Sequence, residues 1–83
     1  MDRIDEAGVR QFIRSGTLHS CRASLTEDGW TVEIEAGSAR FRLHRARDGV
    51  RTFRSADALI RWLDRVGIQR AEIHTAGAEE AEA

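Results

Sequence analysis

The chain has 83 residues, enough for one small domain, which buries about 60% of the surface that its unfolded form exposes. Its net charge of −1 excludes little, whereas its single cysteine excludes an intramolecular disulfide framework and suits a reducing cytoplasm. No apolar run approaches the roughly 20 residues of a membrane span, and the polar, acidic N-terminus is not typical of a signal peptide. We therefore expect a cytoplasmic protein with no membrane partner.

Residues 5–14 have the spacing of a short helix. Asp5 is placed to cap its N-terminus, and Val9 and Phe12 share one face. Gly16 follows as a typical C-terminal stop.

Residues 30–45 alternate between apolar and polar side chains on both sides of Gly37 and Ser38. Period-two alternation around a glycine-containing turn predicts a half-buried antiparallel hairpin. A two-residue turn gives the same register on both faces. The apolar pairs are Ala36–Ala39, Ile34–Phe41 and Val32–Leu43, and the charged pairs are Glu35–Arg40 and Glu33–Arg42.

Residues 17–25 alternate in the same way and predict a strand that precedes this hairpin. Asp28 and Gly29 form a strong signal for a type I′ turn, so the two hairpins share a central strand in a three-stranded meander. The turn predicts the pairs Leu25–Val32, Ala23–Ile34, Cys21–Ala36, Ser24–Glu33 and Arg22–Glu35.

The second half of the chain predicts a strand, a helix and a strand. Residues 50–53 follow a turn and are expected to return along the strand before them as a fourth strand. Residues 55–66 predict a helix capped by Ser55 and ended by Gly67. Residues 68–74 predict a last strand with Ala71 and Ile73 inward, and residues 76–83 an acidic disordered tail.

These elements predict an α+β fold: a short N-terminal helix, an antiparallel meander of three to four strands, one main helix packed on the sheet, and a final C-terminal strand. We expect a single domain over residues 1–75, in which one helix or two cover the apolar face of the sheet and the other face meets solvent.

No residue pattern indicates catalysis. His19 and Cys21 are expected on one strand face, but no second pair completes a metal site. Glu33 and Glu35 face arginines in the predicted register, which favours ion pairing on a solvated face over paired catalytic carboxylates. No glycine cluster opens a helix to hold a phosphate. We expect no enzyme, catalytic residue, metal, cofactor or small-molecule substrate.

Arginine is unevenly distributed. Residues 40–54 contain six arginines and a single acid, Asp48, and this stretch is the candidate surface for nucleic acid or another partner. Guanidinium groups on adjacent strands can make bidentate contacts to backbone phosphates. A solvated edge, balanced by neighbouring glutamates, is the alternative interpretation. Base stacking is disfavoured because the core needs the two phenylalanines of this stretch. The candidate binding residues are Arg40, Arg42, Arg45, Arg47, Arg51 and Arg54.

A family resemblance comes from residues 53–59, Trp62 with Leu63, and residues 66–73. Together with the preceding meander, these segments resemble small plasmid partition-associated proteins, sometimes called the ParC type, in which a capped helix begun by an aromatic residue leads into a Gly-Ile or Gly-Val strand. The resemblance covers most of residues 10–74 and supplies no catalytic residue.

The resemblance implies a bacterial non-enzymatic accessory protein of plasmid or mobile-element partition and maintenance. Such a protein acts through protein–protein contacts, with or without direct contacts to DNA. The expected partners are therefore a partition protein, DNA or both. The alternative is an inhibitor or anti-defence protein of a mobile element that binds a protein target.

We also expect a homodimer, because chains of this size often gain stability by association. An edge strand, either residues 50–53 or the last strand, could pair with its copy. Trp62, at the margin of the apolar stripe of its helix, is the candidate dimer contact.

Overall fold

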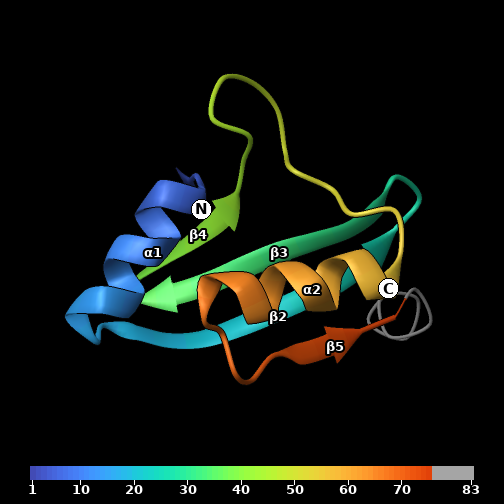
Figure 1. Cartoon of the computed structure of the whole chain (residues 1–83). Helices are drawn as coiled ribbons and strands as arrows, with labels where there is room; N and C mark the ends of the chain where they lie inside the picture. The colour runs from blue at the N-terminus through green and yellow to red at the C-terminus, as the bar shows by residue number, and fades with distance from the viewer. Residues whose placement is uncertain (76–83) are drawn as a thin grey trace.

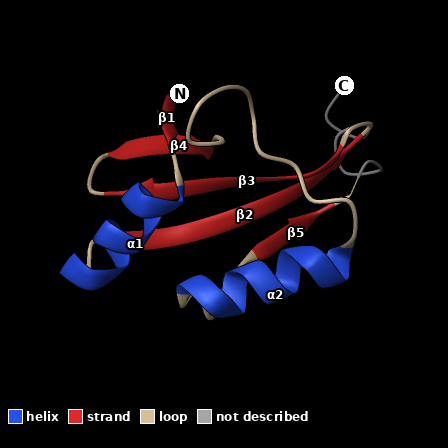
Figure 2. Ribbon diagram, turned by 45° about the horizontal axis from the view of Figure 1, so that its top comes forward, coloured by secondary structure: helices blue, strands red, loops and turns tan. Residues whose placement is uncertain are grey.

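The computed structural model describes residues 1–75. Within this range the chain forms a five-stranded mixed sheet with two helices on one face (Figures 1 and 2), which confirms the predicted α+β class. The strand order is β1-β4-β3-β2-β5. In chain order the elements are β1 (Asp2–Ile4), α1 (Glu6–Ser15), β2 (Leu18–Thr26), β3 (Gly29–Ala36), β4 (Ala39–Leu43), α2 (Ala56–Val66) and β5 (Glu72–His74).

The hairpin of β3 and β4 has the predicted register. Ala36 pairs with Ala39 and Ile34 with Phe41, and the predicted glutamate–arginine pairs lie opposite each other on the other face. This prediction is confirmed because a two-residue turn and the alternation of both strands require the same pairing.

The predicted register of β2 on β3 is wrong by two residues. Leu25 pairs with Trp30 instead of Val32, because the turn consists of residues 27 and 28. Thr26 stabilises this turn by donating its hydroxyl to the Gly29 carbonyl at 2.8 Å. A slip of two residues leaves every side chain on the same face, so alternation cannot distinguish the two registers.

Residues 50–53 do not form the expected fourth strand. They make only two isolated bridges, one from Val50 to His44 and one from Phe53 to Trp30. The place beside β4 is taken by β1, which runs parallel to it and was not predicted. Phe53 instead bonds β3 beyond the end of β4, where its N–H and carbonyl pair with Trp30 at 2.9 and 2.8 Å.

Both helices have the predicted caps. Asp5 and Ser55 accept hydrogen bonds from N–H groups of the first helical turns. Gly16 and Gly67 end the helices in the left-handed conformation. The face of α2 toward the sheet buries Leu59, Trp62, Leu63 and Val66.

The last strand is shorter than predicted and lies at the sheet edge. β5 runs parallel to β2 and begins at Glu72, whereas Ile68 is buried next to the C-terminus of α2. Ile73 was expected inward but is 53% exposed, because an edge strand has a neighbour on one side only. The expected acidic tail, residues 76–83, lies outside the described residues.

Candidate functional site

The face of the sheet opposite the helices, called the open face, carries a row of charged side chains across all five strands. The arginines of β1 and β4 are neighbours, and the charges alternate from β4 to β5. Three ion pairs link its glutamates to arginines: Arg42 with Glu33 at 2.9 Å, Arg22 with Glu72 at 3.6 Å, and Arg40 with Glu35 at 3.9 Å. Each acid offsets one base, so Arg40 and Arg42 contribute little net charge here. By strand register the row is Arg3, Arg42, Glu33, Arg22 and Glu72.

Arg45 and Arg47 lie in the long loop that leaves β4 and projects from the sheet (Figure 1). The Nε atom of Arg45 donates to the Asp48 carbonyl at 2.8 Å, which orders the loop. Arg54 is exposed next to the N-terminal cap of α2.

Arg51 lies on the helical side of the sheet, away from Arg40 and Arg42. Its Nη1 donates to Glu6 Oε1 at 3.0 Å, and its guanidinium carbon lies 5.1 Å from the centre of the Phe53 ring and 5.5 Å from that of the Trp62 ring. The sequence suggested that the arginines of residues 40–54 form one continuous surface. The structure shows that they do not.

Glu6, in the first turn of α1, joins both helices and the loop before α2. Besides Arg51, its carboxylate accepts from Trp62 Nε1 at 2.9 Å and from Arg10 Nη2 at 3.2 Å, and Arg65 Nη2 lies 3.5 Å away. We call Arg10, Arg51 and Arg65 the helical arginine cluster.

The contacts of Glu6 lower its pKa from 4.5 to about 2, chiefly through the hydrogen bond from Trp62 and then that from Arg51. Glu6 is therefore ionised at neutral pH. Sequence reasoning missed this centre. The four-residue spacing of Glu6 and Arg10 was the one signal, since the other partners come from residues 51–65.

Trp62 cannot serve as the expected dimer contact. The side chain is 1% exposed, packs against Phe53 with ring centres 5.5 Å apart, and uses its only donor on Glu6. Trp62 instead belongs to the buried stripe of α2, because its ring fills the space between the helix and the loop before it.

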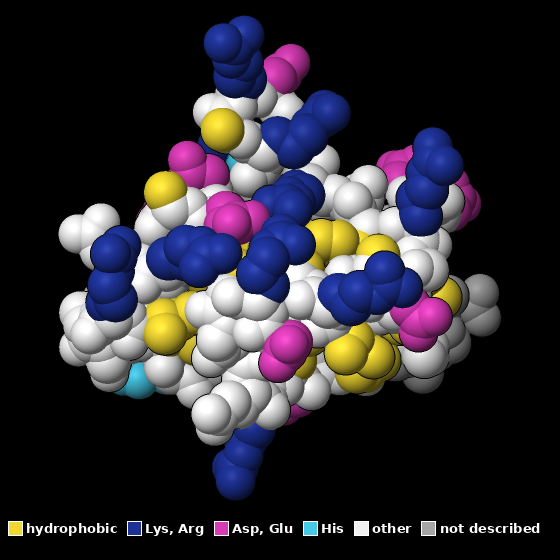
Figure 3. All heavy atoms as spheres, in the orientation of Figure 1, with side chains coloured by type: hydrophobic (Ala, Val, Ile, Leu, Met, Phe, Trp, Pro, Cys, Tyr) yellow, Lys and Arg dark blue, Asp and Glu magenta, His cyan; other side chains and the backbone are white. Residues whose placement is uncertain are grey.

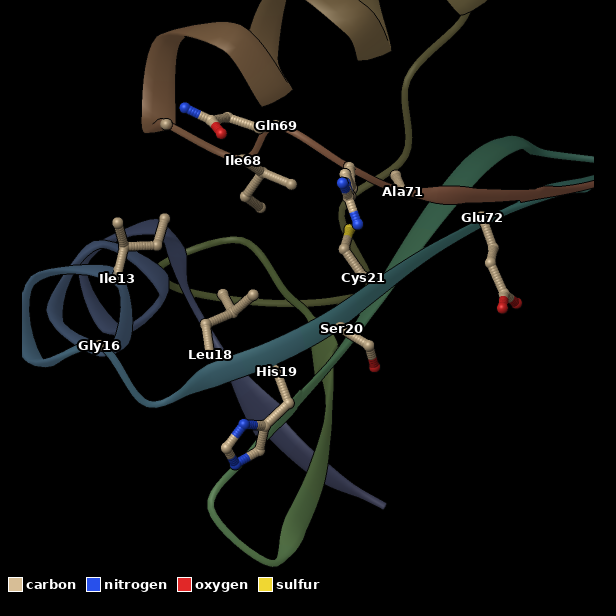
Figure 4. Close-up of a pocket in the computed structure, with 12 residues that line it drawn as sticks. Ile13, Gly16, Leu18, His19, Ser20, Cys21, Ile68, Gln69, Ala71 and Glu72 are labelled. Carbon is tan, nitrogen blue, oxygen red and sulfur yellow. The ribbon is translucent and has the colours of Figure 1, made fainter.

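A groove of about 800 Å³ lies beside the first residues of β2, since β5 pairs only with residues 22–24 of that strand. Ile13, Leu18 and Ile68 point into this groove, whereas His19 points away (Figure 4). Burial raises the pKa of the Cys21 thiol, which also lines the groove, to about 11. The thiol therefore stays protonated at neutral pH and is a poor nucleophile.

His19 lies at a bulge between Leu18 and Ser20, which interrupts the alternation that would place it on the same strand face as Cys21. His19 is exposed while Cys21 is buried, so they do not share a strand face. Within residues 1–75, no three histidine, cysteine or acidic side chains are grouped as metal ligands.

Comparison with known proteins places the chain in no family. No family model matches it, and no curated protein or solved structure is significantly similar to it. Neither helix in the described part has the length and apolar character needed to cross a membrane. What the chain binds must therefore be inferred from its own surfaces.

Proposed function

We propose that this chain is a non-enzymatic accessory protein of plasmid or mobile-element partition and maintenance, which acts in the cytoplasm by binding other macromolecules. The observation that carries this proposal is the helical arginine cluster. One carboxylate there faces three guanidinium groups, all within 3.5 Å of it, which leaves a surplus of positive charge on the surface.

Fold stability explains only part of this arrangement. Trp62 and Arg51 make the contacts that chiefly lower the Glu6 pKa, whereas Arg10 and Arg65 are 40 and 57% exposed. Exposed ion pairs of this kind contribute only about 0–1 kcal/mol each, and a third arginine beside one carboxylate adds repulsion from the other two. A surplus of guanidinium groups is typical of surfaces that recognise phosphate or carboxylate groups on a partner. The resemblance to partition-associated proteins supplies the biological context.

The proposal is tested by retention of the element that encodes the chain. Deleting its coding sequence should raise the frequency of element loss during growth without selection, and the wild-type chain supplied in trans should restore retention. Unchanged retention after deletion would reject a maintenance role. Copurification with a toxin or nuclease, in place of partition proteins or plasmid DNA, would favour the inhibitor alternative.

We further propose that the chain forms a homodimer through the edge of β5. Within residues 1–75 that strand pairs on one side only, and its Ile73 is 53% exposed. Pairing with a second copy would satisfy the free backbone groups and cover this side chain. The test is the molar mass measured by light scattering at tens of micromolar.

A further inference from the structure

We propose that the helical arginine cluster binds backbone phosphates of duplex DNA. This inference rests on the proposed maintenance function and names the partner of the same surface. It moves the candidate DNA contact from the open face of the sheet, where Arg40 and Arg42 lie, to the side covered by the helices.

The cluster is organised before any ligand arrives. Its guanidinium groups come from α1, from the loop before α2 and from α2, and all meet at the Glu6 carboxylate. Arg51 is further held against the Phe53 and Trp62 rings. Side chains already held in place lose less rotamer entropy on binding than free surface arginines would.

The charge of this side also favours an anionic partner. Glu6 stays ionised and neutralises one of the three cluster arginines, so the cluster keeps two positive charges. Arg14 and Arg61 lie one helical turn from Arg10 and Arg65, while Asp57 and Asp64 reduce the positive charge along α2. Seen from the side of α2, arginine side chains gather over the helices (Figure 3).

A preference for duplex over single-stranded DNA follows from the burial of the nearby rings. Trp62 is 1% exposed and Phe53 7%, and the guanidinium of Arg51 lies over both. No ring of this site is therefore free to stack on an unpaired base, which disfavours single strands. The large groove beside β2 has other lining residues, so the cluster is a surface site suited to an extended polyanion.

Two double variants test the site, since each removes two positive charges. Arg10→Gln/Arg65→Gln changes the cluster, and Arg22→Gln/Arg40→Gln changes the open face. The four side chains are comparably exposed, 40 and 57% in the first pair and 44 and 63% in the second. A third variant, Glu6→Gln, removes the neutralising charge from the cluster.

Binding is measured by fluorescence anisotropy with a labelled duplex of about 20 base pairs at about 50 and 200 mM salt. Arg10→Gln/Arg65→Gln should raise the Kd about tenfold and reduce the slope of log K against log salt by about 2. The open-face variant should change the Kd less than about threefold, since its arginines are paired with glutamates. Glu6→Gln should lower the Kd.

The proposal is overturned if the wild-type chain does not bind the duplex at low salt, or if both double variants weaken binding equally. Equal binding of labelled polyglutamate, with the same dependence on the variants, would assign the cluster to an acidic protein and also overturn it. Thermal unfolding of each variant confirms that it is folded. Should Glu6→Gln not fold, the two double variants still decide.

The maintenance role and the DNA site can be refuted independently of each other. Element loss after deletion, combined with no duplex binding by the wild-type chain, would keep the maintenance role and reject this DNA site. Duplex binding with unchanged retention would keep the site and reject the role.

Discussion

The ion-pair centre at Glu6 makes stability depend on pH in a predictable direction. Its contacts lower the pKa of Glu6 from 4.5 to about 2. A carboxylate with a lowered pKa contributes stability that is complete above the unfolded pKa, here 4.5, and is lost as the pH falls toward the folded pKa, here about 2. At 1.36 kcal/mol per pKa unit a fully shielded group would contribute about 3 kcal/mol. The side chain is 30% exposed, so solvent screening reduces the expected contribution to about 1–2 kcal/mol.

Glu6→Gln measures this contribution directly. The amide oxygen can still accept from Trp62 Nε1, so the substitution removes mainly the charge. We expect the free energy of unfolding to fall by about 1–2 kcal/mol at pH 7, and the difference from wild type to shrink by more than half at about pH 3. Urea denaturation is the assay, because urea is uncharged and does not screen ion pairs.

Glu27→Gln is the control, since Glu27 is exposed in the turn between β2 and β3. It should change the free energy of unfolding by less than about 0.5 kcal/mol at either pH. If the effect of Glu6→Gln is the same at pH 3 and pH 7, the ionised carboxylate is not the source of the stability and the reasoning is wrong.

Three further predictions concern stability, reactivity and assembly. Gly29→Ala should lower the free energy of unfolding by more than about 2 kcal/mol, because φ is +124° and the added Cβ would lie 2.6 Å from the Phe53 carbonyl oxygen. Gly37→Ala, at φ +60° with no atom within 4 Å of its Cβ, should cost only about 1 kcal/mol; equal losses of stability in urea would contradict the predicted difference. Cys21 should react slowly with a thiol reagent at pH 7 and rapidly only after unfolding, since its thiol is buried and its pKa is about 11; fast labelling of the folded chain would refute this. Ile73→Arg should convert the proposed dimer to a monomer by light scattering, and a dimer that survives the change would exclude the β5 edge.

Sequence patterns identified the elements whose determinants are local. The helix caps at Asp5 and Ser55 were predictable because a cap depends on residues three positions apart. The register of β3 on β4 was predictable because a short turn joins strands whose two faces agree. The order of elements around them gave the α+β class without any knowledge of packing.

The candidate site was less accessible to sequence reasoning. Arginine density in residues 40–54 identified Arg51 as a candidate, but not its location on the helical side of the sheet. Arg51 contacts Glu6, which lies 45 positions earlier in the chain, and a pattern of neighbouring residues cannot predict such a contact. Helical spacing places Trp62 at the margin of the apolar stripe, because spacing alone does not reveal that Phe53 and Glu6 contact the other side of its ring.

The sequence by itself therefore determined the helices, the meander and the face to which the residues of β3 and β4 and most residues of β2 point, since 3.6- and 2-residue periods, turns and caps are properties of adjacent residues. The bulge between Leu18 and Ser20 is the exception. Only the tertiary structure showed the two-residue slip of β2, because both registers bury the same side chains. It also placed β1 and β5 as parallel edge strands, and it assembled three distant arginines around Glu6. These features depend on contacts between segments far apart in the chain, which no local pattern encodes.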